Sequence, residues 1–220
     1  MYKRQIIAAG KGRSASKGLE VKYVSIYKGS TRVKGFFKLS EKVNEASLSY
    51  DVMFGDDFQF VKGGKMHGLG PDHPITGNWK QRPDGWSARV MWGKGGKITT
   101  VLEEQDSKAK WGVYRSNDTF KFKKGRFYSV TIYVKLNSDP NKRDGLAQIY
   151  VDGQLLINHD NIRFWRKPDA NISQFLFSTF HGGGTPEWAP KDEKGNHVNV
   201  HAYFDNFLVS RGLAVKGERK

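Results

Sequence analysis

Cysteine is absent from this chain of 220 residues. Disulfide bonds and thiolate metal sites are therefore excluded, although this absence leaves the redox compartment undetermined. The sequence also lacks any apolar run near the ~18 residues that a membrane-spanning helix requires, and it contains no amphipathic basic helix. We therefore expect no membrane partner.

The sequence motifs of several enzyme classes are missing as well. There is no HExxH, GxxxxGK[ST] or GxSxG, and no GxGxxG opens a helix. The motifs typical of metalloproteases, nucleotide-binding proteins and esterases are therefore missing. Hydrolysis by paired carboxylates is disfavoured because the acidic residues show no Glu-x-Asp-x-x-Glu pattern. The obvious candidates for such a pair are Asp51, Asp56, Asp57, Glu103 and Glu104.

Acidic residues are few compared with basic ones. The chain has 22 Asp and Glu against 37 Lys and Arg, which gives a formal net charge of +15. This excess is typical of proteins with a polyanionic partner, which can be nucleic acid, an anionic membrane surface or an acidic polysaccharide, and charge alone does not choose among them. No RNA-binding module surrounds the aromatic and basic run at 120–124, so nucleic-acid binding is supported by charge alone.

The two ends of the chain are expected to lie outside the folded domain. Residues 1–5 (MYKRQ) lack the apolar segment of a signal peptide and resemble read-through of a sequencing-library adapter. We interpret them as non-native and expect that an export signal was lost with the natural N-terminus. One domain over residues 6–212 and a basic flexible tail over 213–220 complete the predicted organisation.

The folded part is predicted to be all-β. Its 14 Phe, 9 Tyr and 6 Trp provide enough apolar surface for one large core. Apolar and polar residues alternate in 130–136, which predicts a strand whose even-numbered side chains face inward. Asp152-Gly153 suits a type I′ turn between two strands. Further strands are predicted at 48–54, 147–151, 154–157, 175–181 and 198–209. Many short strands with glycine-rich turns predict a β-sandwich or jelly roll.

Two segments would present polar side chains on one sheet face. Ser87 and Arg89 are two residues apart, so a strand points both to the same side, while Trp86 and Trp92 alternate with them and are expected in the core. Gly63-Gly64 fits a bend or a close backbone approach, with Lys65 emerging beside a turn. The alternative is an ordinary solvated sheet face, on which Arg89 pairs with Glu103 or Asp84.

A site rich in cations and poor in acids suits β-elimination on a uronic acid polymer. Removal of the proton at C5, beside the carboxylate, builds enolate-like charge that nearby cations stabilise. A base must take that proton, and an acid must protonate the leaving glycosidic oxygen. His, Tyr or Lys side chains with shifted pKa values can fill both roles.

The sequence resembles a known family through motifs that occur in order between about residues 46 and 210. These are 58–69 (FQFVKGGKMHGL), 86–92 (WSARVMW), 133–137 (YVKLN), 144–145 (DG), 151–153 (VDG), 177–183 (FSTFHGG), 188–190 (WAP) and 203–207 (YFDNF). Together they resemble polysaccharide lyase family 14 and the related family 20 glucuronan lyases. The resemblance implies a single β-jelly roll, concanavalin-like, whose concave basic cleft holds alginate or glucuronan. It also implies a secreted protein, extracellular or periplasmic.

The resemblance assigns three site residues. Lys65 matches the family's catalytic GGK lysine, and Ser87 and Arg89 match its substrate-cleft Ser-x-Arg pair. The alginate lyases of the family also carry a Tyr-x-Tyr pair about a dozen residues after the arginine, where this chain has Ile98-Thr99-Thr100-Val101-Leu102-Glu103 without tyrosine. Substitutes must come from elsewhere in the chain.

We therefore expect Tyr133 and His181 to serve as acid or base, with His67 and Lys135 lining the cleft. The alternatives to these site roles are structural, namely a half-buried strand tyrosine and histidines that form hydrogen bonds with the backbone of a turn. No cofactor is expected to be required, although Asp205 and Asn206 are candidate oxygen ligands for a structural Ca²⁺.

The predicted function is β-elimination on a polyuronate, such as glucuronan or alginate, by a monomer that binds no nucleic acid. A non-catalytic module that binds acidic polysaccharide is the alternative.

Overall fold

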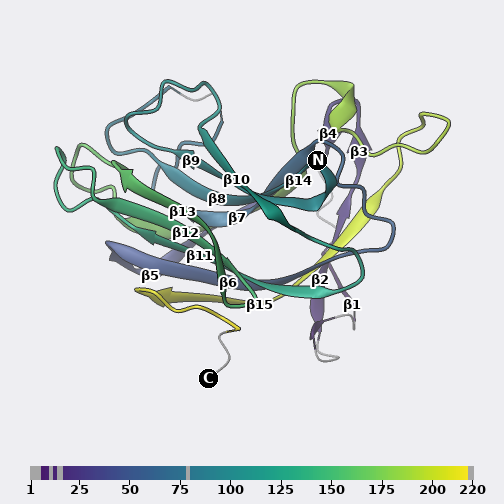
Figure 1. Ribbon diagram of the computed structural model, residues 1–220, viewed down its shortest axis with the longest axis horizontal. Coiled ribbons are helices and arrows are strands. Elements are labelled where there is room, and N and C mark those ends of the chain that lie inside the picture. Colours follow the sequence, from purple (N-terminus) through teal and green to yellow (C-terminus); the bar gives the residue numbers. More distant parts are fainter. Residues whose placement is uncertain (1–5, 10–11, 14–16, 78–79, 218–220) are drawn as a thin grey trace.

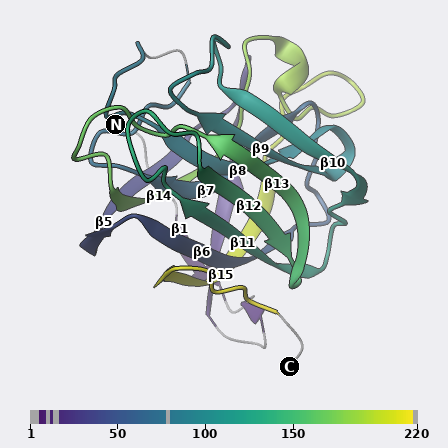
Figure 2. The same cartoon turned by 60° about the vertical axis from the view of Figure 1, so that its left-hand side comes forward.

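The computed structural model describes residues 6–9, 12–13, 17–77 and 80–217, and it is a sandwich of two antiparallel β-sheets (Figure 1). Two views related by a rotation show the sheets as stacked layers (Figure 2). The described residues include no α-helix, and no helical segment among them has the length and apolar character needed to cross a bilayer. The predicted all-β jelly-roll sandwich is therefore confirmed.

One layer is a seven-stranded sheet with the order β1-β2-β15-β6-β11-β12-β13. Its strands are β1 (Ile6–Ala9), β2 (Gly18–Tyr23), β6 (Glu45–Phe54), β11 (Phe127–Lys135), β12 (Gly145–Val151), β13 (Gln154–Ile162) and β15 (Val200–Arg211). The hairpin between β12 and β13 turns at Asp152-Gly153, where both residues have the positive φ that a type I′ turn requires.

The other layer is a six-stranded sheet with the order β10-β9-β8-β7-β14-β5. Its strands are β5 (Val33–Val43), β7 (Gly63–Gly70), β8 (Ser87–Gly93), β9 (Lys97–Glu103), β10 (Val113–Lys121) and β14 (Ile172–His181). A small ladder joins β3 (Ser25–Ile26) to β4 (Gly29–Ser30), and two 3₁₀ turns, η2 (Lys94–Gly96) and η3 (Pro186–Trp188), lie in connections.

The core fills the space between the two layers. Val130, Ile132 and Val134 of β11 are fully buried there, as the alternation in this segment predicts. Trp86 and Trp92 reach the same core from the opposite sheet, which confirms their expected position. Because each strand gives one face to the core, its other face remains available for a site or for a covering segment.

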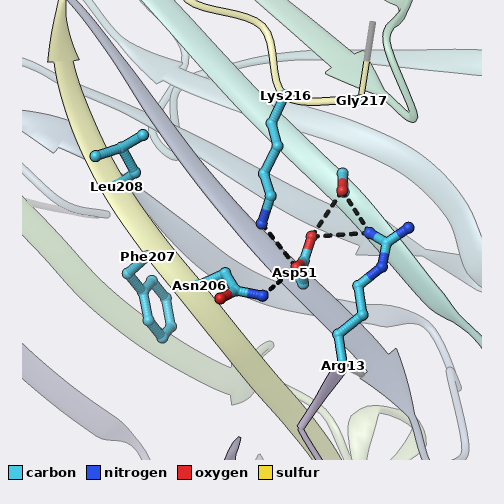
Figure 3. A pocket seen from close by; sticks show the side chains of 8 residues that line it. Arg13, Asp51, Asn206, Phe207, Leu208, Lys216 and Gly217 are labelled. Carbon is cyan, nitrogen blue, oxygen red and sulfur yellow. Dashed lines mark hydrogen bonds and ion pairs between the residues drawn. The ribbon is translucent and has the colours of Figure 1, made fainter. Parts of the chain in front are cut away.

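Arg13, between β1 and β2, and Lys216, after β15, contact the outer face of the seven-stranded sheet, where Asp51 of β6 is fully buried. Arg13 and Lys216 form ion pairs with its carboxylate, at 3.0 and 2.7 Å respectively (Figure 3). The Ser129 hydroxyl and the Asn206 amide donate to it as well. The backbone N–H groups of Ala214 and Lys216 also donate to Ser47 and Thr131 of this sheet, and the flexibility expected of the basic tail over 213–220 stays a prediction. Residues 1–5 and 218–220 lie outside the described residues.

Candidate active site

Strand β8 brings polar side chains to the outer face of the six-stranded sheet. Ala88 and Val90 are fully buried in the core, so Ser87, Arg89 and Met91 point to the opposite side. The displayed Ser-x-Arg pair predicted from the sequence is thus present. The pairing of β8 with β7 and β9 fixes what lies beside these side chains.

Arg89 is a buried guanidinium that forms no ion pair with a carboxylate of the described residues. Its side chain is only 4% exposed, and its Nε has no hydrogen-bond partner in the described structure. Burial lowers the pKa of Arg89, and the nearby Glu103 and Tyr114 partly offset that effect. A buried cation without an ion-pairing partner is costly, so this group is arranged to receive an anion from outside the chain.

Gly68 of the neighbouring strand β7 leaves space for the Arg89 side chain. A Cβ atom at Gly68 would lie 2.7 Å from Arg89 Cγ and 2.0 Å from the Ala88 carbonyl oxygen. Any side chain at this position would therefore displace the arginine or the ladder. The two glycines before Lys65 have a similar role, because a Cβ at Gly64 would lie 2.1 Å from the Trp92 ring. The predicted close approach is confirmed there.

Lys65 lies inside the β7 ladder, opposite Met91 of β8 and Phe180 of β14, and not beside a turn as predicted. Its Nζ donates to Met91 Sδ at 2.9 Å and to the Tyr114 hydroxyl at 3.3 Å. Burial holds the pKa of Lys65 well below its usual value, the charge of Arg89 lowers it further, and Glu103 partly opposes both. This lysine is therefore closer to a neutral amine than an exposed lysine is.

Tyr114 supplies a phenol beside Lys65 from strand β10, and the sequence analysis missed it. The Lys65 ammonium lies 4.9 Å from the centroid of the Tyr114 ring. Burial raises the pKa of Tyr114, Arg89 opposes the rise and Glu103 adds to it, so its hydroxyl stays protonated at neutral pH. In the structure Tyr114 pairs with Val101, which belongs to the segment where the family's tyrosines are expected. The sequence does not show this pairing, because the two residues are 13 positions apart and meet only in the folded chain.

Glu103 is a buried carboxylate on the same face, directly opposite Ser87. Its Oε1 accepts a hydrogen bond from the Gly77 backbone at 2.9 Å. Burial raises the pKa of Glu103, while the Gly77 bond, Arg89 and Lys65 lower it. The alternative of a structural ion pair for Arg89 is not seen, because Asp84 pairs instead with Arg82 and Glu103 bonds Gly77.

Two serine hydroxyls beside Arg89 also lack partners. The Oγ atoms of Ser87 and Ser178 are buried and form no hydrogen bond within the described residues. Ser178 and Arg89 line a small pocket on this sheet together with Lys34, Phe36, Thr76 and Leu176. Unpaired hydroxyls next to an unpaired guanidinium are arranged to bind a ligand that carries both hydroxyl and carboxylate groups.

Tyr133 and Lys135 lie in the other sheet. Both belong to β11, on the face opposite the core-facing Val134. The Tyr133 hydroxyl donates to Glu45 at 2.6 Å, and this burial and bonding raise its pKa. The structure therefore contradicts the expectation that Tyr133 moves protons, or that Lys135 lines the cleft, beside Lys65. The YVKLN motif gave no information on which sheet carries it.

His67 faces the core because of a β-bulge. Between the pairs Lys65–Met91 and Gly68–Arg89, two residues of β7 oppose one of β8, which turns His67 away from the Lys65 face. It is fully buried against aromatic rings, its Nδ1 accepts from the Ser178 backbone, and burial lowers its pKa to about 3. Its predicted place in the cleft is therefore wrong.

His181 also points into the core, against Phe58 and Trp92. Its Nε2 bonds the Gln59 carbonyl oxygen at 2.7 Å, and burial lowers its pKa to about 4. On β14 the residue that shares the face of Lys65 is the adjacent Phe180. His181 is thus excluded as the acid or base, and the alternative of a histidine bonded to backbone is confirmed.

The candidate Ca²⁺ ligands Asp205 and Asn206 belong to the network around Asp51. Asp205 accepts the Arg13 backbone N–H, and the Asn206 amide donates to Asp51. Lys216 and Arg13 already bring positive charge to this carboxylate. The donor set therefore does not fit a cation, and no group of three or more acidic or histidine side chains in the described part of the chain could hold a metal ion.

Comparisons with known proteins agree with the sheet architecture and identify the family. The family model for polysaccharide lyase 14 matches residues 10–207. The marine PL-14 alginate lyase from Aplysia kurodai is 24% identical, with a TM-score of 0.77 over 94% of this chain and 87% of that one. The endo-β-1,4-glucuronan lyase from the fungus Trichoderma reesei is 13% identical, with a TM-score of 0.65 over 94% and 86%.

A third similar structure is the alginate lyase Aly36B. A mutant with one lysine and one tyrosine replaced by alanine, in complex with alginate tetrasaccharide, is 24% identical with a TM-score of 0.73, over 90% of this chain and 82% of that one. Another mutant replaces a lysine and a methionine and is in complex with alginate trisaccharide. The curated proteins give no match.

The family match extends beyond the motif-bearing region on its N-terminal side and covers most of the chain. The identities of the solved structures are low, so these structures establish the fold, and the family model establishes the kinship. The chain therefore belongs to the polysaccharide lyase 14 family and is a polysaccharide lyase.

Proposed function

We propose that this protein depolymerises a polyuronate by β-elimination, with Arg89 binding the substrate carboxylate and Lys65 and Tyr114 moving the protons. The observation that carries the proposal is the buried guanidinium of Arg89, whose Nε has no hydrogen-bond partner, beside a lysine and a tyrosine that touch each other. A uronate carboxylate supplies the anion that this arrangement lacks, and sugar hydroxyls supply partners for Ser87 and Ser178.

Arg89 prepares the substrate for proton loss at C5. A guanidinium forms two parallel hydrogen bonds with a carboxylate, which fixes the sugar and withdraws charge from C5. The negative charge that develops on the carboxylate oxygens in the transition state is then stabilised in a site with little water. Ser87, on the same strand face, orients the sugar through its hydroxyl.

Lys65 is the base and Tyr114 is the acid. The lowered pKa of Lys65 makes its neutral amine accessible, and the raised pKa of Tyr114 keeps its proton available. Lys65 Nζ takes the C5 proton, the electron pair of that bond forms the C4=C5 double bond, and the C4–O4 bond breaks. Tyr114 donates its proton to O4, so the products are an unsaturated uronate end and a new saturated end.

The contact between the two groups restores the site. After one turnover Lys65 carries an extra proton and Tyr114 lacks one. Their hydrogen bond, at 3.3 Å, gives a direct route for the proton to return. No metal is needed in this scheme, since Arg89 supplies the positive charge.

The substrate class rests on the acid-poor site and on similar proteins. The Aly36B mutants that hold alginate oligosaccharides each lack a lysine, together with a tyrosine or a methionine. The same three residue types, Lys65, Met91 and Tyr114, meet in this site. Alginate and glucuronan are the first substrates to test, and such polymers place the enzyme outside the cell.

The test is an assay of the purified protein against a panel of alginate, polymannuronate, polyguluronate and glucuronan. We expect rising ultraviolet absorbance from the conjugated C4=C5 bond with at least one polymer, and loss of that rise in Lys65→Ala. Retention on an immobilised polyuronate with no product from any polymer would contradict the catalytic proposal and favour a binding module. Full activity of Lys65→Ala would contradict the assigned base.

A further inference from the structure

The edge strand β5 and the residue before it carry a second group of cations on the face that holds Arg89. Alternation along the strand puts Arg32, Lys34 and Phe36 on one side, and their partners on β14 include Ser178 and Leu176. Lys34 and Phe36 line the same pocket as Arg89. The polar surface of the candidate site therefore continues across the sheet to its edge.

The cations on β5 are close together and receive no compensating carboxylate. Arg32 lies 5.2 Å and Lys34 5.8 Å from the centroid of the Phe180 ring, so both heads gather over one aromatic side chain. No described acidic side chain forms an ion pair with either residue. Burial lowers the pKa of Lys34, and the charges of Arg32 and then Arg89 lower it further.

An anion bound against both Arg32 and Lys34 would relieve the repulsion between these two cations. Arg89 and Lys34 belong to strands separated by three ladder spacings, or roughly 14 Å of backbone, and the Arg89 side chain lies above Gly68 on the way. A polymer laid across the strands from Tyr114 toward β5 meets Arg89 first and Lys34 next. Phe36 is exposed at the edge and offers a ring for stacking against a sugar.

We propose that Lys34 and Arg32 bind the carboxylate of the uronate next to the one held by Arg89, with Phe36 under its ring. This second carboxylate subsite rests on the proposed function, because it assumes that Arg89 holds a uronate. It requires a charged sugar at two successive positions, so the enzyme selects continuous polyuronate over chains in which uronate alternates with neutral sugar.

Binding is measured by calorimetry in the inactive Lys65→Ala background, with saturated tetrasaccharides of mannuronate, guluronate and glucuronate. We expect Lys34→Met to weaken binding about tenfold and Lys34→Arg to restore most of the affinity. The control is Lys123→Met, which removes an equal charge from an exposed site after β10. A tetrasaccharide with its carboxyl groups reduced to alcohols is expected to bind Lys34→Met and its parent equally.

Equal affinity of Lys34→Met and its parent for every charged tetrasaccharide would overturn the subsite, and so would an equal loss in Lys123→Met. If Lys34→Met does not fold, judged by its melting temperature, Arg32→Met is the replacement variant with the same expectation. If the wild type cleaves no polymer but Lys34→Met still binds tetrasaccharide more weakly than its parent, the subsite is supported and the lyase chemistry is contradicted. Cleavage by the wild type with unchanged binding in Lys34→Met contradicts the subsite alone.

Discussion

Arg89, Lys65 and Tyr114 come from three different strands, and only the fold brings them together. The first two could be identified from the sequence, because they match the GGK and Ser-x-Arg motifs of the family that the chain resembles. Tyr114 could not, since its place depends on the pairing of β10 with β9. The sequence points to Tyr133 instead, because it shows which residues share a strand face but not which sheet carries the strand.

Separate replacement of Tyr114 and Tyr133 by phenylalanine tests which of the two is the acid. Tyr114→Phe removes the proposed acid, and we expect kcat to fall by about 10²–10⁴-fold with little change in KM. Tyr133→Phe removes only a hydrogen bond to Glu45 in the other sheet and serves as the matched control. Steady-state kinetics on the polymer that wild type cleaves best would contradict the assignment if Tyr133→Phe were the slower enzyme.

The pH profile follows from the two shifted pKa values. Lys65 must be neutral to act, so kcat/KM rises with pH through its lowered pKa, and Tyr114 must be protonated, so activity falls at high pH through its raised pKa. Glu103 favours the protonated form of Lys65. We therefore expect Glu103→Gln to move the acidic limb to lower pH. A shift of that limb to higher pH, or none, would exclude this coupling.

At the scale of elements, the bulge in β7 decides which side chains reach the site. Without it, His67 would share the face of Lys65, as simple alternation predicts. The bulge could not be predicted, because it appears as one residue without a partner only when β7 is aligned against β8. Strands β6 and β11 were predictable from their period, and so was the hairpin at Asp152-Gly153.

Gly68 is the position in β7 where a side chain would meet Arg89. Gly68→Ala puts a methyl group against Arg89 and the Ala88 carbonyl, so we expect a loss of about 1–3 kcal/mol in the free energy of unfolding and a large fall in kcat/KM. Gly184→Ala is the control, because a Cβ there meets nothing within 4 Å. Denaturant titration and kinetics check both, and wild-type behaviour of Gly68→Ala would show that Arg89 does not depend on this approach.

Across the whole molecule, the sandwich has two outer faces with different uses. The six-stranded sheet carries Lys65 and Arg89 of the candidate site on its outer face, whereas the seven-stranded sheet buries Asp51 under Arg13 and Lys216. Composition predicted one basic domain but not this division, because contacts of Arg13 and Lys216 with Asp51 join residues far apart in sequence. For the same reason the sequence does not show that Lys216 contacts Asp51.

The Asp51 network is expected to stabilise the fold in a pH-dependent way. Burial raises the pKa of Asp51, but bonds from Lys216, Ser129 and Asn206 together outweigh it and leave the pKa below its usual value. A lowered folded-state pKa stabilises the protein above the unfolded value of about 3.9, and this stabilisation is lost as the pH falls through the folded-state pKa.

We therefore expect Asp51→Asn to cost about 3 kcal/mol at neutral pH, with the difference from wild type shrinking in acid. The control is Asp118→Asn, whose carboxylate is 83% exposed in its pair with Lys97 and whose loss should leave the melting temperature unchanged. Thermal unfolding over a pH series measures both. A difference that stays constant into acid would argue against an ionised Asp51.

The central claim is that polyuronate is cleaved by elimination and not by hydrolysis. Mass spectrometry of the products formed in water enriched in heavy oxygen tests it directly, with alginate and glucuronan as substrates. The account predicts unsaturated oligosaccharides lighter by one water than the saturated ones, with no heavy oxygen introduced by cleavage, and none of these products from Lys65→Ala. Saturated products that carry heavy oxygen from cleavage would contradict it.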